Sequence, residues 1–176
     1  MFDPAKLDSV NGEYVRALSA DDFAARARPF VEEELGRPLE EDEWSAFVSV
    51  APLVQERTRR LDEVGSQVRF LFEGDLAYDE ASWAKVMEKD GVSDVLTEAR
   101  VRLADAEPFD TTQVEQALRG MLEALEIGAR KGLQPVRVAV TGSSVSPPLF
   151  ESVAALGRHR TLARLDVCLQ RLAGSS

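Results

Sequence analysis

The spacing of apolar side chains is the feature that most constrains what this chain can fold into. The clearest stretch begins at Thr112 and Glu115, which form a typical capping-box pair, and continues with the apolar positions Val114, Leu118, Met121, Leu122 and Leu125. Residues three or four apart lie on one face of a helix, so this stretch predicts a long helix that ends near Gly132. The same spacing recurs along most of the chain and favours a helical fold.

Two helices are predicted in the first third of the chain. Ser19 can cap the first of them, which contains Pro29 and ends at Gly36. The second begins at the acidic run Glu40–Glu43, and its periodicity continues toward Leu61, so its end carries the arginines Arg57, Arg59 and Arg60. Shorter helices are expected over 68–72, 83–87 and 92–103.

The C-terminal third contains one segment whose pattern and context disagree. Residues 136–141 alternate as in a β-strand, but nothing else in the chain offers a sheet for this strand to join. Ser146, Pro147 and Pro148 then predict the start of a helix, with the serine hydroxyl as the cap. A last helix over 158–173 has the apolar face Leu162, Leu165, Leu169 and Leu172, and its arginines Arg158, Arg160, Arg164 and Arg171 are expected elsewhere on the surface.

Charge divides the chain unevenly. The whole chain carries a net charge of −10, which argues against a protein that coats nucleic acid or an anionic membrane through bulk charge alone. The last 47 residues carry seven basic and two acidic residues, a net charge of +5, which leaves −15 for residues 1–129. The proline-containing stretch 106–110 is typical of a linker, so we expect two subdomains, 1–106 and 107–176.

Residue types that carry most enzyme chemistry are scarce. A single cysteine, Cys168, excludes an internal disulfide, and with a single histidine, His159, a zinc site is effectively excluded. His159 is expected to be solvated and Cys168 to be a small buried hydrophobe. The turn over 141–144 resembles a phosphate-binding loop but lacks its glycine spacing and its lysine, so a polar turn is the preferred interpretation. We therefore expect no catalytic residue and no metal site.

No segment has the length or hydropathy of a membrane span, and the N-terminus lacks the apolar core of a signal peptide. A cytoplasmic protein is expected by default. What remains for function is a set of arginines at the ends of the predicted elements. Guanidinium groups at such positions either pair with nearby acids or bind a planar polar ligand in bidentate fashion, and ion pairing is the more common outcome.

The sequence over 134–151, with its prolines and glycines in order, closely resembles the C-terminal signature of bacterial glutamyl-tRNA synthetases. The resemblance continues through Leu156-Gly157-Arg158 and Leu162-Ala163-Arg164-Leu165. Residues 2–7 and 11–16 resemble the segment that enters the anticodon-binding domain of that family, and Arg69-Phe70-Leu71-Phe72 resembles a landmark within it. The resemblance covers essentially the whole chain.

This resemblance implies an all-α fold of two small helical subdomains that form a cage around the anticodon, with residues 1–16 entering from the stem-contact region. It also implies a helix over 136–141. The ATP-binding motifs of the family precede this region, so a C-terminal fragment is implied that is inactive alone. The intact ligase would join glutamate to tRNA(Glu) with ATP and magnesium, and the fragment itself would hold no cofactor. The implied partner is tRNA(Glu), with tRNA(Gln) left open as a second one, and the protein is expected to be a monomer.

Site residues follow from the same resemblance. Arg57 aligns with the family arginine that reads the third anticodon base, where cytosine offers acceptors to a guanidinium and guanine offers an N–H donor. Ser146, Pro147 and Leu149 fall on residues that contact the other anticodon bases, although Ser146 stands where the family has threonine. Arg119 and Arg137 match family arginines on the same concave side.

Two other functions stay open at this point. A helical protein-interaction module could use its acidic face, residues 32–34 and 40–43, to bind a basic partner. An enzyme in its own right is the weakest alternative, because the chain lacks an evident nucleophile, base or cofactor loop.

Overall fold

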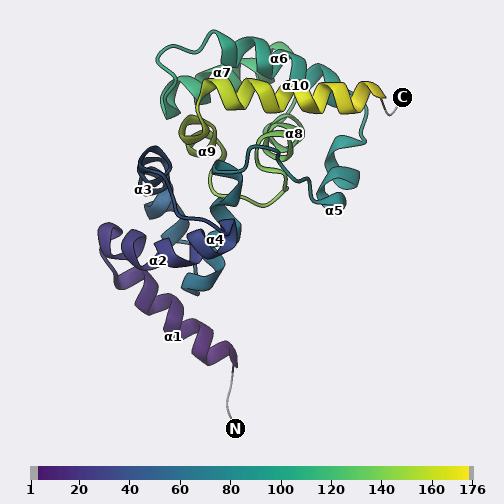
Figure 1. Cartoon of the computed structure of the whole chain (residues 1–176). Coiled ribbons are helices and arrows are strands. Elements are labelled where there is room, and N and C mark those ends of the chain that lie inside the picture. Colours follow the sequence, from purple (N-terminus) through teal and green to yellow (C-terminus); the bar gives the residue numbers. More distant parts are fainter. Residues whose placement is uncertain (1–3, 175–176) are drawn as a thin grey trace. The chain divides into compact units, whose positions relative to one another are not determined.

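The computed structural model describes residues 4–174, with side chains from Ser9 onward, so Phe2 and Asp3 of the resembling N-terminal segment lie outside the described residues. The chain forms two compact units, Met1–Glu73 and Gly74–Ser176. Every regular element among the described residues is helical (Figure 1). The all-α fold predicted from the sequence is confirmed.

The first unit packs three long helices with short helical turns. Its elements are α1 (Pro4–Ala17), α2 (Ala20–Leu35), α3 (Glu41–Gln55), η1 (Leu61–Glu63), α4 (Val64–Val68) and η2 (Arg69–Leu71). The caps of α2 are those predicted: Ser19 Oγ accepts the Asp22 amide at 3.1 Å, and Gly36 ends the helix with a φ of 68°. The periodicity predicted that α3 continues toward Leu61, but the helix ends six residues earlier, at Gln55. The arginines 57, 59 and 60 therefore lie in the loop that follows.

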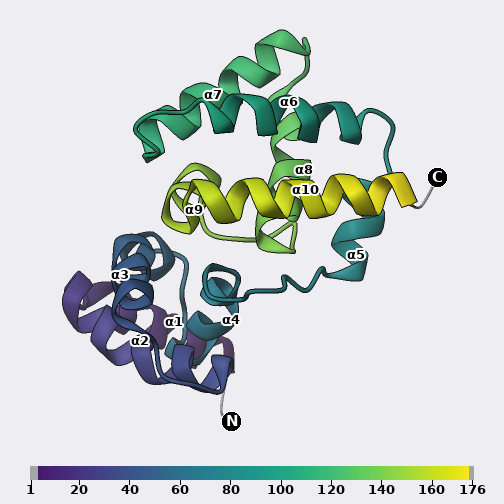
Figure 2. The ribbon, with the colours of Figure 1, turned by 45° about the horizontal axis from the view of Figure 1, so that its top comes forward.

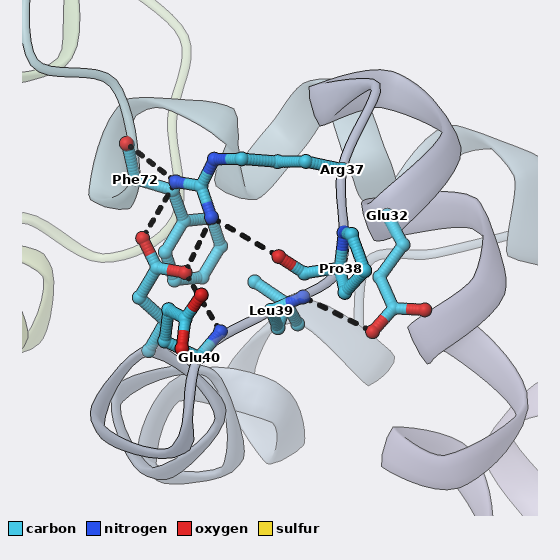
Figure 3. A network of polar contacts seen from close by, with 7 residues as sticks. Glu32, Arg37, Pro38, Leu39, Glu40 and Phe72 are labelled. Atoms are coloured by element: carbon cyan, nitrogen blue, oxygen red, sulfur yellow. Dashed lines mark hydrogen bonds and ion pairs between the residues drawn. The ribbon is translucent and has the colours of Figure 1, made fainter.

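A polar network fixes the connection between α2 and α3 (Figure 3). The Arg37 guanidinium donates to both carboxylate oxygens of Glu43, each at 2.7 Å, and reaches the Phe72 carbonyl at 3.5 Å. Glu43 also accepts the Glu40 amide at 3.0 Å and so completes a capping box at the start of α3. The acidic run that begins α3 therefore has a structural role at that helix end.

The second unit is built around α8 and α10, which pack against each other, against α6 and against α9 (Figures 1 and 2). Helix α7 packs on α6, α8 and α9. Its elements are α5 (Glu80–Ser82), η3 (Trp83–Met87, a π-helix), α6 (Val92–Ala104), α7 (Thr111–Ala124), α8 (Ala129–Thr141), α9 (Leu149–Leu156) and α10 (Arg158–Gly174).

The prediction of one long helix from Thr112 to Gly132 is wrong. This stretch is divided into α7 and α8 by a turn at Glu126, whose φ of 52° is incompatible with a continuing helix. Asp110, rather than Thr112, caps α7 by accepting the Gln113 amide at 2.8 Å. The apolar stripe of this region continues through the turn, so spacing alone does not reveal the break.

Residues 136–141 form the second half of α8, so the strand suggested by their alternation is wrong and the helix implied by the resemblance is confirmed. Val136, Val138, Ala139 and Val140 are all fully buried. A helix buried on almost every side does not show helical periodicity, which explains why β-branched residues here imitate a strand.

The expectation that the arginines of α10 lie on the surface is wrong for Arg164. Its side chain is buried, and it donates to the Val140 carbonyl of α8 at 2.6 Å. That carbonyl belongs to the last turn of α8, where backbone acceptors lack helical partners. Arg164 therefore satisfies a helix end inside the core.

The division after Glu73 differs from the boundary expected between residues 106 and 107. Helix α6 packs against α7, α8 and α10, so the proline-containing turn over 105–110 joins two helices of the same unit. None of the helices in the described part of the chain has both the length and the apolar character of a membrane span.

Candidate nucleic-acid interface

Arg57 lies exposed in a loop that is firmly held at both sides. The neighbouring Thr58 is buried, and its hydroxyl donates to the Val54 carbonyl at 2.8 Å. The side-chain amide of Gln55 donates through Nε2 to the carbonyls of Val15 and Leu18 at 2.9 and 2.8 Å. These bonds connect the end of α1 to the end of α3. The loop therefore presents Arg57 from a fixed backbone.

Arg137 organises the segment that leads into α9. Its Nη1 donates to Ser146 Oγ at 2.5 Å and to the Pro147 carbonyl at 2.9 Å. Ser146 donates in turn to the Pro147 carbonyl at 2.8 Å. The hydroxyl is thus used within its own loop, and Pro148 stands at the N-cap of α9, so the prediction that Ser146 caps this helix is wrong.

The polar turn between α8 and Ser146 is held by its own hydrogen bonds. The Gly142 amide donates to the Val138 carbonyl, the Ser144 amide to Ser82 Oγ at 3.0 Å, and the Val145 amide to Ser143 Oγ at 3.1 Å. The Gly142 carbonyl accepts the Asp79 amide at 2.8 Å. Because these amides already have hydrogen-bond partners, the turn does not act as a phosphate-binding loop. It is the polar turn that the sequence analysis preferred.

The start of α9 presents backbone donors next to an aromatic ring. No side chain caps this helix, so the amides of its first turn lack helical partners. Pro147 and Leu149 are both buried. Phe150 lies under the Arg119 guanidinium at 5.8 Å, while Arg119 pairs with Glu115 at 2.6 Å.

Gln134 is a candidate that the sequence analysis did not single out. Its Oε1 is a buried acceptor without a hydrogen-bond partner among the described residues. Gln134 lies one turn before Arg137 on α8, so both side chains project from the same face of that helix. A single-sequence pattern gives no signal for this acceptor, because its burial depends on packing between helices.

The remaining predicted features have ordinary roles. Arg60 pairs with Asp62, and Arg69 pairs with Glu34 and Glu73, as expected for surface arginines. His159 is exposed, as expected. Cys168 is fully buried and donates to Tyr78 Oη at 3.2 Å, and its burial raises the pKa of the thiol, so it is the small buried residue that the sequence predicted.

Within the second unit the structure therefore brings together five of the six predicted site residues: Arg119, Arg137, Ser146, Pro147 and Leu149. Arg57 belongs to the first unit. No group of three or more His, Cys, Asp or Glu side chains that could hold a metal ion occurs among residues 9–174.

Comparisons with known proteins point to one family. The family model of the anticodon binding domain matches residues 22–169. The glutamate–tRNA ligase of Streptomyces coelicolor is 39% identical over 176 residues, covering 98% of this chain and 35% of that protein. The glutamate–tRNA ligase of Mycobacterium sp. strain KMS is 42% identical over 165 residues, covering 93% of this chain and 33% of that protein.

Solved structures agree on the fold. The crystal structure of a glutamate tRNA ligase from Elizabethkingia meningosepticum matches 97% of this chain and 33% of its own, with a TM-score of 0.80 at 18% identity. The chain spans about a third of the length of the curated relatives that it matches. The family match, the resemblance of the sequence and the shared helical fold agree: this chain belongs to the family of anticodon-binding domains.

Proposed function

We propose that the chain binds the anticodon arm of tRNA(Glu) as part of a glutamate–tRNA ligase, and that Arg57 reads the third anticodon base. The observation that carries this proposal is the cluster at the start of α9, where Arg137 holds Ser146 and Pro147 beside uncapped helix amides. Anticodon bases are unstacked loop bases, which proteins recognise by stacking and by hydrogen bonds to their pairing edges.

The cluster supplies each kind of contact that such bases need. Phe150 with the Arg119 guanidinium offers a stacking surface, and the first turn of α9 offers backbone donors. Gln134 Oε1 lacks a partner and can accept an N–H from a base edge. A buried acceptor that is satisfied only by the ligand favours bases that carry a donor at that position.

The rival interpretation, an acidic face that binds a basic partner, receives less support. Glu32 accepts from Arg28 at 2.8 Å, Glu34 from Arg69 at 3.0 Å, and Glu43 pairs with Arg37. Three of the seven acidic side chains of residues 32–34 and 40–43 are therefore paired with arginines within the chain. RNA needs to touch only the arginine-rich positions, so the acidic total does not prevent binding.

The ligase itself is proposed from the relatives, of which the chain covers about a third. The ATP and glutamate sites, with magnesium, are assigned to the rest of that enzyme, and the chain alone is expected not to aminoacylate. We propose a cytoplasmic monomer that holds no cofactor. Whether tRNA(Gln) is also bound depends on more than one arginine.

The test is binding of the 176-residue chain to the anticodon stem-loop of tRNA(Glu), and to the same loop with guanine in place of cytosine at the third anticodon base, at one salt concentration. Tighter binding of the cytosine loop supports the proposal. Equal affinity for both loops contradicts the reading role of Arg57, and absence of binding contradicts the proposal for the isolated chain.

Arg57→Gln is expected to reduce the preference for cytosine by about 1–3 kcal/mol, the usual contribution of a bidentate base contact. The matched control is Arg59→Gln, which removes the same charge from an exposed position on the other side of the buried Thr58. The control should reduce the affinity for both stem-loops by the same factor. If Arg57→Gln also reduces the affinity for both stem-loops by the same factor, Arg57 does not read the base.

A further inference from the structure

A pocket of about 590 Å³ lies in the second unit next to the cluster at α9. Four cationic side chains line it: Lys85 of η3, Lys89 of the following turn, and Arg130 and Lys131 of α8. Ser144 and Val145 form the wall that adjoins Ser146. The single acid in its lining is Asp90, so the lining carries a net charge of +3.

These four cations differ from four of the eight other basic residues of the unit. Arg100, Arg102, Arg119 and Arg158 each pair with a carboxylate, in the pairs Arg100–Asp166, Arg102–Glu98, Arg119–Glu115 and Arg158–Glu107. No described carboxylate lies within 4.0 Å of the pocket cations, although acids outnumber bases by 31 to 21 in the whole chain. In a chain with more acids than bases, most basic side chains are expected to have an acidic neighbour. Four cations without an ion-pair partner around one pocket therefore depart from this expectation.

The placement of these cations is also unfavourable for the helix that carries two of them. Arg130 and Lys131 occupy the first turn of α8, whose positive dipole end favours acids, and this turn contains no acid. Lys85 lies within a π-helical turn, a geometry that occurs frequently at functional sites. A bound anion would relieve both the mutual repulsion of the cations and their conflict with the helix dipole.

We propose that this pocket binds phosphodiester groups of the RNA strand that flanks the anticodon bases. The assignment rests on the proposed function, because Ser144 and Val145 continue directly into Ser146 of the anticodon cluster. Val145, which is 83% exposed, provides an apolar surface for the ribose, whereas the other valines of the lining are buried in the core. The cations act as sequence-independent contacts that hold the strand while the neighbouring cluster meets the bases.

The experiment measures the salt dependence of stem-loop binding by the double variant Lys85→Gln/Lys89→Gln. Loss of two phosphate contacts should make the fall of log K with log salt shallower by about 1.5 and weaken binding by about thirtyfold at 0.1 M salt. The ratio of affinities for the cytosine and guanine loops should not change. The control Arg26→Gln/Arg102→Gln removes the same charge outside the pocket and should leave the slope near that of the unsubstituted chain.

Circular dichroism and thermal unfolding establish whether both double variants are folded. Folding is expected because Lys85, Lys89 and Arg26 are exposed and Arg102 loses only a partly exposed ion pair with Glu98. An unchanged slope in the pocket variant overturns the pocket while leaving anticodon reading intact. A lowered slope together with equal affinity for the two loops supports the pocket and contradicts the reading role of Arg57. Absence of stem-loop binding by the unsubstituted chain overturns both proposals.

A free nucleotide could present the same phosphate chemistry, so ATP serves as a second probe. If the pocket serves RNA, ATP should bind weakly and the pocket variant should change the stem-loop slope. Saturable ATP binding that Lys85→Gln/Lys89→Gln abolishes, with an unchanged stem-loop slope, would overturn the assignment to RNA.

Discussion

Gly142 shows how one residue positions the candidate interface. It ends α8 with a φ of 79°, and a Cβ atom built there would lie 2.2 Å from the Ala77 carbonyl oxygen. Its own carbonyl accepts the Asp79 amide. Both the left-handed conformation and the close approach of the 77–79 backbone require a residue without a side chain.

Gly142→Ala is therefore expected to lower the free energy of unfolding by about 2 kcal/mol or more, since left-handed strain alone costs about 1–2 kcal/mol. Urea unfolding followed by circular dichroism measures the loss. Gly74→Ala is the matched control, because no atom lies within 4 Å of its added Cβ, and it should change stability by less than about 0.5 kcal/mol. Equal stability of the two variants would refute the close approach.

The arginines show that residue type alone does not decide a role. Arg164 is 5% exposed and satisfies a helix end, Arg119 pairs with an acid on its own helix, and Arg137 binds a hydroxyl and a carbonyl. Arg119 and Arg164 lie in helices that the spacing predicted, and Arg137 lies in a helix that only the family resemblance implied. Which partner each one meets depends on the neighbouring helix.

At the scale of elements, Glu32 joins α2 to the start of α3. Its Oε1 accepts from Arg28 Nε at 2.8 Å and from the Leu39 amide at 3.1 Å, and these bonds, that to Arg28 foremost, hold the pKa of Glu32 below its ordinary value of 4.5. The carboxylate form is thus favoured in the folded chain. Its contribution to stability is present above about pH 4.5 and is lost as the pH falls through the lowered value.

Glu32→Gln should reduce the free energy of unfolding at pH 7 by less than about 1 kcal/mol, as is usual for a partly exposed ion pair. As the pH falls toward 3 the difference from the unsubstituted chain should become smaller, because protonation increasingly removes the charge. Urea unfolding at both pH values measures this. The exposed neighbour Glu33→Gln should show no such pH dependence, and a difference for Glu32→Gln that grows at pH 3 would contradict the assigned role.

At the scale of the whole molecule, the two units divide the candidate functions. Arg57 belongs to Met1–Glu73, whereas the α9 cluster and the cationic pocket belong to Gly74–Ser176. The second unit buries its own core, which includes Leu96, Leu103, Leu118, Met121 and Leu165. It therefore contains the apolar contacts that a separately folding domain requires.

A chain of residues 74–176 is expected to fold cooperatively and to bind the stem-loop without preferring cytosine to guanine at the third anticodon base, because Arg57 is absent. Thermal unfolding and the binding assay with both loops measure these two properties. A persistent preference for cytosine would assign the reading of that base to the second unit. Non-cooperative unfolding would show that the second unit depends on the first.

The sequence by itself determined the helical class, the ends of α2, the burial of Cys168 and the family. These depend on local chemistry: a serine oxygen that meets an amide three residues on, a glycine that tolerates positive φ, and prolines and glycines in a recognisable order. It also located the segment 146–149 as a candidate site through the resemblance. The roles of these residues in RNA binding stay predictions.

Only the tertiary structure decided the features that depend on contacts between helices. Packing among α7, α8 and α10 decides three features: the break at Glu126, the helix at 136–141 and the burial of Arg164. The spacing of residues along the sequence carries no information on such packing. The unpartnered Gln134 oxygen and the four pocket cations belong to the same class. Residues 85 and 130 are distant in sequence, and η3 and α8 pack together only in the folded chain, because burial of their apolar faces is a property of the whole unit.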